Sequence, residues 1–242
     1  MKKIIFFLGL LLTFSSLTAQ KKVTETKKSS GIDEVFVHVK FADKIEVKNW
    51  DKNEISVEAT VSLNNNQHND YFQLKGDNDG GVYTIKSDYG TFFKDHGCNY
   101  YNSSKKNEKK KYDSNCKTEM DINYVIYVPR NMKLKVKSIS GSVKADSYAG
   151  MLDLDLISGN IDIKKHSKNM KLKTISGDID IYVSDATFEA KTLSGGIYSD
   201  LKIDYDKQNK YSGSRRIKAT IKNGDASLKL STISGDIFLR KS

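Results

Sequence analysis

The sequence has little proline, cysteine and tryptophan: one, two and one residues, respectively, among 242. It also has almost no alanine-rich stretch or leucine heptad, which argues against a mainly helical architecture. Isoleucine, valine, threonine and tyrosine are common instead, and these residues favour strands. We therefore expect an all-β protein with few helices.

Long apolar runs are absent except at the N-terminus, where Ile4 to Leu12 follows Lys2 and Lys3. These nine apolar or glycine positions are too few for a membrane span, which takes about 20 residues. Together with Leu17-Thr18-Ala19 they have the pattern of a secretory signal peptide. We expect residues 1–19 to be cleaved and the mature protein to be periplasmic, outer-envelope associated or secreted, without a transmembrane span. A retained anchor is the alternative. No cysteine lies near the cleavage site, so a lipoprotein anchor has no attachment point.

The two cysteines, Cys98 and Cys116, flank a polar, lysine-rich segment. In an oxidising compartment they can form a disulfide, which is the pairing we expect. The competing interpretation is a metal site formed by His96, Cys98 and Cys116. This set supplies only three ligands at a spacing that is not diagnostic. The sequence predicts no cofactor.

The formal net charge is +10, and lysine carries most of it. A basic surface can attract nucleic acid, anionic lipid or acidic polysaccharide. Here the lysines are spread over alternate positions of expected strands, apart from a block between Lys105 and Lys111, and this spread favours solubility and edge protection. Export argues against nucleic acid as the partner.

Five short segments share a Ser-Gly step between aliphatic residues. Their glycines are Gly141, Gly159, Gly177, Gly195 and Gly235. The first four are separated by 18 residues each. A fixed period of this kind is typical of a protein built from stacked structural units.

Within each unit, apolar residues recur seven, five and two positions before the glycine and two positions after it. This predicts two half-buried strands joined at a corner beside the Ser-Gly step, with a change of phase that turns all four positions inward. A β-hairpin meander is the alternative, but it would expose the aliphatic residue two positions before each glycine. We predict a β-solenoid, similar to a single-stranded β-helix, with coils of about 18 residues. It would form one elongated domain over residues 33–242, after a flexible tether at 20–32 and with an inserted loop at about 89–118.

Charged residues support parallel stacking of consecutive coils. Six positions before the glycine, the sequence has Lys135, Asp153, Lys171 and Glu189, which alternate in sign. Four positions before it, Lys137, Asp155 and Lys173 alternate as well, but Lys191 breaks the pattern. The serine before each glycine recurs in every unit, which indicates a stacking requirement and argues against a catalytic nucleophile.

The Thr-Ile-Ser-Gly-Asp-Ile step, Tyr127-Val128-Pro129 followed by Leu134-Lys135-Val136, and the opening segment Gly31 to Val35 resemble a known family. It is the bacterial "putative adhesin" family of the domain-of-unknown-function 4097 type. The resemblance covers roughly residues 31–242. It implies a β-helical envelope protein and brings no catalytic residues with it.

Three functions compete. The leading hypothesis is a noncatalytic, adhesin-like envelope protein that binds an envelope polysaccharide or a surface protein. Its expected binding loop holds Tyr100, Tyr101, Lys109, Lys110 and Lys111, since aromatic rings stack on sugars and lysines meet acidic groups. A second hypothesis is a signalling component of an envelope-stress system that acts through a protein partner. The third is a polysaccharide-active enzyme that uses Asp162, Asp178 and Asp180, although glycoside hydrolysis needs two carboxyl groups at a defined separation.

Overall fold

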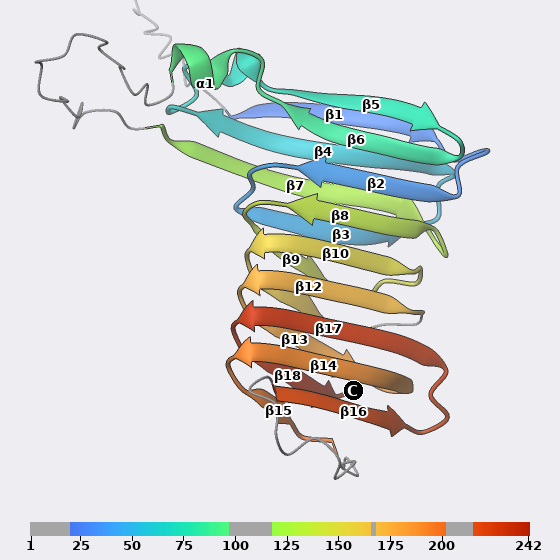
Figure 1. The fold of residues 1–242 in the computed structure, drawn as a ribbon. Helices are drawn as coiled ribbons and strands as arrows, with labels where there is room; N and C mark the ends of the chain where they lie inside the picture. Colours follow the sequence, from blue (N-terminus) through green and yellow to red (C-terminus); the bar gives the residue numbers. More distant parts are fainter. Residues whose placement is uncertain (1–19, 97–117, 166–167, 202–214) are drawn as a thin grey trace, which may run out of the picture.

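The computed structural model describes residues 20–96, 118–165, 168–201 and 215–242. They form two large β-sheets that face each other in an elongated stack (Figure 1). The helical structure in these residues is a 3-10 turn, η1 (Asn69–Tyr71), and a short helix, α1 (Phe92–Asp95). No helix in these ranges combines the length and apolar character needed to cross a membrane. The expected all-β class is confirmed.

We name the two sheets sheet A and sheet B, and each has nine strands. Sheet A runs β1 (Lys21–Lys28), β4 (Glu54–Leu63), β7 (Met120–Pro129), β3 (Lys44–Trp50), β9 (Ser142–Ala145), β11 (Ile161–Ile163), β13 (Ile179–Val183), β18 (Ile237–Lys241) and β15 (Ile197–Ser199). Sheet B runs β16 (Arg215–Ile221), β14 (Ala186–Ser194), β17 (Ala226–Ser234), β12 (Met170–Ser176), β10 (Leu152–Ser158), β8 (Lys133–Ser138), β2 (Glu34–Val39), β6 (Val82–Asp88) and β5 (Gln73–Asp79).

Neighbouring repeat units pair in parallel through equivalent residues. Leu134 lies beside Leu152, and Leu152 lies beside Met170, at the 18-residue offset of the sequence repeat. Alternate residues of each strand point between the sheets, because side chains in a strand alternate between its two faces. The apolar residues seven and five positions before each glycine are thereby buried, and those of both sheets form one continuous core.

The expected inward orientation of the aliphatic residue two positions before each glycine is wrong. In sheet B the inward alternation continues to the residue three positions before each glycine, which is buried and is serine, leucine or threonine: Ser138, Leu156, Thr174, Thr192 and Thr232. A buried threonine is satisfied there because its hydroxyl donates to the glycine carbonyl of a neighbouring unit, as Thr174 does to Gly159 at 3.1 Å. The aliphatic residue two positions before the glycine therefore points outward.

The repeated glycine allows the units to approach closely. Gly177 has φ +149°, a conformation that residues with a side chain rarely adopt, and a Cβ on it would lie 2.2 Å from the carbonyl oxygen of Gly159. Gly159 is placed in the same way against Gly141. The glycine is therefore required both by its backbone conformation and by the unit stacked beside it.

The units do not stack in the order of the chain. Strand β17 lies between β12 and β14, and β18 lies between β13 and β15, so the last unit is inserted between two earlier ones (Figure 1). The predicted contact between Lys171 and Glu189 is therefore wrong, because Lys229 separates them. The mismatch between Lys173 and Lys191 is also explained, since Ser231 lies between these two lysines.

The N-terminal end of the stack differs from the rest. Residues 21–28 were expected to lie in a flexible tether, but they form β1, which pairs antiparallel with β4 along its whole length. Val23 contacts the core, and the main-chain pairing with β4 accounts for the order of this polar segment. The expected inserted loop begins with α1, and most of it, residues 97–117, lies outside the described residues.

Candidate functional site

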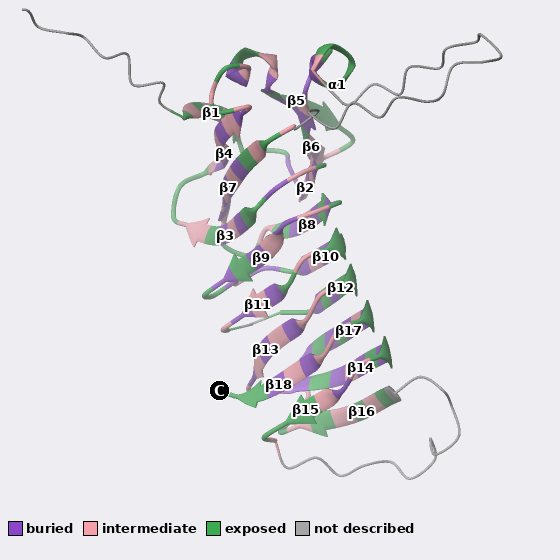
Figure 2. Cartoon of the chain, turned by 90° about the vertical axis from the view of Figure 1, so that its left-hand side faces the viewer, coloured by how far each residue is buried: buried purple, intermediate pink, exposed green. Residues whose placement is uncertain are grey.

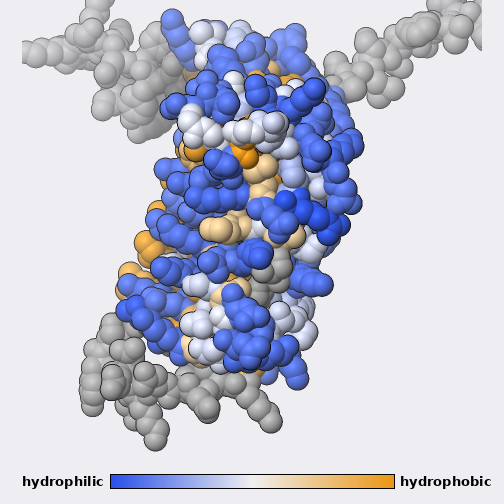
Figure 3. Space-filling model, turned by 90° about the vertical axis from the view of Figure 1, so that its right-hand side faces the viewer, coloured by the Kyte–Doolittle hydropathy of each residue, from blue (hydrophilic) through white to orange (hydrophobic). Residues whose placement is uncertain are grey.

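The residues predicted to bind a partner fall where the structure gives no description. Cys98 and Cys116, together with Tyr100, Tyr101 and Lys109 to Lys111, lie within residues 97–117, and the expected signal peptide lies within residues 1–19, so all of them fall outside the described residues. On the side of the molecule seen in Figure 3, hydrophilic residues cover most of the surface.

A groove opens on the outer face of sheet A, at the junction between the N-terminal strands and the repeat units. It has a volume of about 270 Å³ and is lined by Glu46, Val47, Lys48, Asn49, Lys144, Asp146 and Ser147. The groove forms because β9 ends at Ala145, whereas β3 continues to Trp50 alongside β7. Asn49 links β3 to the chain at Ala149 and at Pro129. Its side-chain oxygen accepts a hydrogen bond from the backbone amide of Ala149 at 2.7 Å, and its side-chain nitrogen donates to the carbonyl of Pro129 at 3.2 Å.

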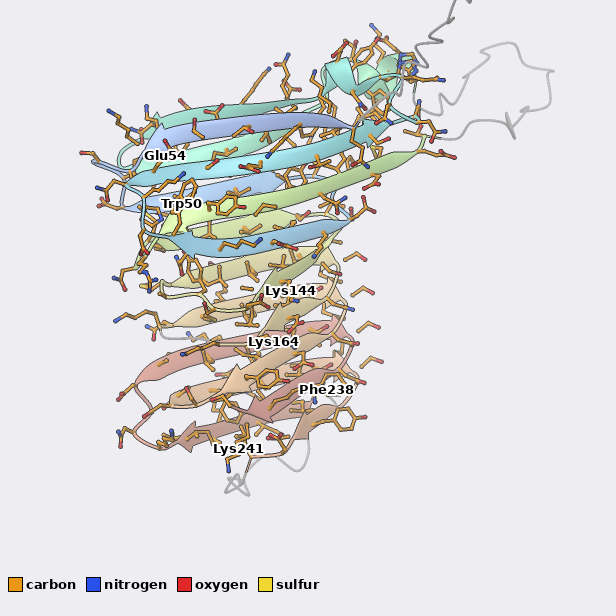
Figure 4. The ribbon with its side chains drawn as sticks, turned by 180° about the vertical axis from the view of Figure 1, so that it is seen from behind. Trp50, Glu54, Lys144, Lys164, Phe238 and Lys241 are labelled. Atoms are coloured by element: carbon orange, nitrogen blue, oxygen red, sulfur yellow. The ribbon has the colours of Figure 1, made fainter. Side chains whose placement is uncertain are left out.

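An aromatic platform lies beside this groove. The ring of Trp50, labelled in Figure 4, stacks on the ring of Tyr127 with the two centroids 4.9 Å apart. The indole nitrogen of Trp50 donates to the carbonyl of Glu54 at 2.6 Å, which fixes the ring. Lys52 lies 4.6 Å from the Trp50 ring centroid, and Lys48 lies 5.9 Å from that of Tyr127. The platform is therefore a fixed pair of rings with a lysine ammonium over each ring.

The groove floor carries a tight cluster of charges. Glu46 pairs with Lys44 and, at 2.8 Å, with Lys48. Hydrogen bonds from these two lysines lower the pKa of Glu46 to about 2. The same contact raises the pKa of Lys48. Lys144 and Asp146 form a second, looser pair at 3.5 Å. The charges that line the groove balance, and Lys44, which pairs with Glu46 without lining the groove, leaves the surrounding region a net positive charge.

Aromatic and charged side chains continue along the outer face of sheet A. Lys164 lies 5.0 Å from the Tyr182 ring centroid and pairs with Asp162 at 2.8 Å, which raises the pKa of Lys164. Further along, Tyr198 and Phe238 stack at 5.4 Å. Figure 4 shows Trp50, Lys144, Lys164 and Phe238 spread along this one face. It therefore presents rings and charges at several points along the stack.

The three aspartates proposed for polysaccharide cleavage each have a separate partner. Asp162 pairs with Lys164, and the Nε of Arg240 donates to the Asp180 carboxylate, with its two oxygens at 2.7 and 2.9 Å. Asp178 accepts the backbone amide of Asp236 at 2.8 Å. Each of the three carboxylates thus makes a contact within the stack. Among the described residues, no group of three or more His, Cys, Asp or Glu side chains is arranged to hold a metal ion.

The sequence interpretation missed the platform. Its signal was the alternation from Lys44 to Trp50, which puts Glu46, Lys48 and Trp50 on one face. What could not be seen was the pairing of β3 with β7, because about eighty residues of chain separate the partners.

Residues 128–240 match the family model described as Toastrack DUF4097. The resemblance predicted from the repeat is confirmed. The matched Toastrack segment begins in β7 and ends in β18, so it contains all five Ser-Gly steps. Strands β1 to β6, which form the N-terminal end of the stack, precede it. The groove joins the two regions, with Lys144 and Asp146 in the Toastrack segment and Glu46 and Lys48 before it.

One solved structure shares the fold. A Clostridium sporogenes protein described as a "putative cell adhesion protein" superposes with a TM-score of 0.61 at 12% identity, over 92% of this chain and all of that one. A "putative adhesin" from Bacteroides fragilis reaches a TM-score of 0.34 at 9% identity, over 93% of this chain and 99% of that one. No curated protein matches the sequence. The first likeness shows that the whole two-sheet architecture, including the N-terminal strands, occurs elsewhere.

Proposed function

We propose that this chain is an exported, noncatalytic binding protein of the cell surface or envelope, and that the outer face of sheet A binds polysaccharide. The stack would serve as a β-solenoid of 18-residue coils that holds this face rigid. The description of the Clostridium sporogenes structure as a "putative cell adhesion protein" agrees with such a role. The observation that carries the proposal is the stacked pair Trp50–Tyr127 at the edge of a polar groove.

Chemistry favours a sugar ligand at this position. Aromatic rings offer flat apolar surface with fixed geometry, and a sugar presents an apolar ring face together with many hydroxyls. The neighbouring groove supplies amide, hydroxyl, ammonium and carboxylate groups for those hydroxyls. Its volume of about 270 Å³ lies just below the lower end of the range for small-molecule pockets, so a single sugar unit would fill it. Further rings along sheet A would then contact later units of a chain.

The charge of the groove favours acidic over neutral polysaccharides. The lining residues Lys48 and Lys144 balance Glu46 and Asp146, and Lys44, which pairs with Glu46 without lining the groove, adds the excess cation that attracts an anionic sugar. Lys48 is in addition half exposed. We therefore expect a carboxylated polysaccharide such as a uronic acid polymer to bind more tightly than an uncharged one of the same length.

Binding to immobilised polysaccharide tests this function. We expect Trp50→Ala and Tyr127→Ala each to weaken binding at least tenfold. A nucleobase stacked on an aromatic side chain contributes about 1–3 kcal/mol, and we expect a sugar ring packed on these side chains to contribute a similar amount. Met151→Ala, at an exposed apolar residue outside sheet A, is the matched control and should leave binding unchanged. If Trp50→Ala and Tyr127→Ala bind as tightly as Met151→Ala, and thermal melts show that all three are folded, this face is ruled out as the site.

A further inference from the structure

One edge of the stack carries a row of exposed aliphatic residues. They are the residues two positions before each glycine, and in spatial order they are Ile139, Ile157, Ile175, Ile233 and Leu193. Each of these residues has between 37% and 59% of its surface exposed. In Figure 2 the corresponding strand ends of β10, β12, β17 and β14 form a column of exposed arrowheads. We call these five residues the aliphatic ridge.

The fold does not require an aliphatic residue at this position. In the unit that begins with β2, Val39 pairs with Ser138, so the next residue, Lys40, occupies the place equivalent to Ile139. The backbone amide of Ile139 donates to the carbonyl of Lys40 at 3.0 Å. A lysine is thus accommodated in the same backbone setting. The aliphatic side chains of the other five units therefore point to a purpose outside the packing of the stack.

The surface beside the ridge on sheet B is basic. The two outward rows next to it contain six lysines and three carboxylates: Lys135, Lys137, Lys171, Lys173, Lys191 and Lys229 against Asp153, Asp155 and Glu189. Each of the three carboxylates is already paired, for example Asp155 with Lys173 at 3.4 Å. Lys137, Lys191 and Lys229 form no ion pair with any described residue. The free charge next to the ridge is therefore positive.

On the other side of the ridge, the acidic residues are engaged within the stack. Asp178 accepts the amide of Asp236 at 2.8 Å, and Asp236 accepts the amide of Gly196 at 2.6 Å. Between them and the ridge lie the small serines of the Ser-Gly steps. The ridge thus has serines and, beyond them, the carboxylates of Asp178 and Asp236 on one side, and lysines on the other.

The shape of this surface limits the partner. Five stacked residues make a row roughly 19 Å long and one side chain wide, from four steps of about 4.8 Å. Such a row offers a few hundred Å², below the roughly 800 Å² that each partner buries in a standard protein–protein interface. It lies at the corner between two sheets and projects from it, whereas a peptide or small ligand needs a groove. A straight projecting row of this kind can instead contact a partner whose surface is flat and deformable.

We propose that the aliphatic ridge and the adjoining lysines dock the protein onto an anionic lipid bilayer. The five aliphatic side chains would enter the boundary between headgroups and acyl chains, and Lys137, Lys191 and Lys229 would meet lipid phosphates. Apolar burial combined with attraction to anionic headgroups is the general basis of peripheral membrane binding. This site is separate from the polysaccharide face on sheet A.

Vesicle co-sedimentation tests the proposal with the whole mature chain. We expect binding to vesicles of equal parts phosphatidylglycerol and phosphatidylcholine, and at least tenfold weaker binding to pure phosphatidylcholine. The triple variant Ile157→Thr, Ile175→Thr, Ile233→Thr keeps β-branched residues in the strands and should lose at least tenfold in binding. Met151→Thr, an equally exposed apolar residue away from the ridge, should bind like wild type.

A second variant keeps the test decisive if the triple variant folds poorly. Lys137→Gln, Lys191→Gln, Lys229→Gln removes charges from exposed positions without touching the ridge, and we expect at least a tenfold loss on anionic vesicles. Absence of wild-type binding to anionic vesicles would overturn the proposal. So would a ridge that instead joins two copies, seen as a concentration-dependent dimer that the threonine variant abolishes while vesicles bind neither protein.

Discussion

Asp178 and Asp236 lie in neighbouring layers of the stack, joined by a 2.8 Å hydrogen bond from the amide of Asp236 to the carboxylate of Asp178. The same contact recurs between other layers: Asn160 donates to Ser142, Asp178 to Asn160, and Gly196 to Asp236. These bonds follow the spatial order of the units. They show that the unit containing Asp236 lies between those of Asp178 and Gly196, although it comes last in the chain.

This order of the units can be tested by disulfide cross-linking in a Cys98→Ser, Cys116→Ser background. Adjacent strands lie about 4.8 Å apart, within the Cα separation that a disulfide accepts. We expect rapid oxidation for Lys171→Cys with Lys229→Cys, and for Lys229→Cys with Glu189→Cys. The pair Lys171→Cys with Glu189→Cys is two strands apart and should stay reduced. Cross-linking of that third pair alone would mean that the units stack in chain order.

The close contact between glycines predicts a large loss of stability for Gly235→Ala. The added Cβ would lie 2.0 Å from the carbonyl oxygen of Gly177, at a φ of +153°. We expect a loss of about 3 kcal/mol or more in the free energy of unfolding. Gly80→Ala is the control, because Gly80 also has a positive φ but no heavy atom lies within 4 Å of its Cβ position. Its cost should be about 1 kcal/mol, and similar losses for both variants would refute the stacking explanation.

The buried hydroxyl of Thr232 should make a smaller contribution. It donates to the carbonyl of Gly177 at 3.0 Å. Thr232→Val keeps the shape and removes the donor, so we expect a loss of about 1 kcal/mol in chemical denaturation. The exposed Thr187→Val serves for comparison and should change stability by less than about 0.5 kcal/mol. An unchanged midpoint for Thr232→Val would show that the hydroxyl adds nothing.

The charge cluster in the groove predicts a pH dependence. Glu46 has a pKa of about 2 in the folded protein, below its ordinary value of 4.5, because Lys44 and Lys48 hold its ionised form. Its contribution to stability is therefore complete above about pH 4.5 and is lost as the pH falls toward 2. Both lysines are about half exposed, so we expect at most about 1 kcal/mol.

Denaturation of wild type and Glu46→Gln between pH 6 and 2 measures this contribution. The difference in unfolding free energy should shrink across the window from about pH 4.5 to 2. In an NMR titration, Lys48→Gln should raise the pKa of the Glu46 carboxyl toward its ordinary value. A difference that stays constant with pH, or a carboxyl that titrates alike in both proteins, would contradict the proposed ion pairing.

Much of the architecture could be predicted because the sequence repeats it. The 18-residue period gave the pairing offset, and alternation gave the buried residues before each glycine. The period could not reveal that β17 is inserted between β12 and β14, since every unit carries nearly the same inward residues and fits either place. The ambiguous position was the one three before glycine, where Leu156 and Thr174 occupy the same buried setting. Taking the aliphatic residue two positions before glycine as buried produced the mistaken phase change.

The candidate site was less predictable than the fold. Aromatic and lysine residues between 97 and 117 drew attention because they cluster in the chain, and they lie outside the described residues. The Trp50–Tyr127 platform joins two distant strands, so no local pattern marks it. The aliphatic ridge was visible as a row of recurring residues, but burial was assumed because the side chains are apolar. Hydrophobic character predicts burial poorly when strand alternation points the other way.

The proposed polysaccharide face contains the chain's single tryptophan, which makes intrinsic fluorescence the most direct measurement of the central claim. Titrating the mature protein with a soluble uronic acid polymer should give a saturable change in Trp50 emission, because a sugar stacked beside Tyr127 excludes water from the indole. Tyr127→Ala should weaken the apparent affinity at least tenfold, and Met151→Ala should leave it unchanged. A folded wild-type protein whose emission does not respond to acidic or neutral polysaccharides would contradict the claim that this face binds them.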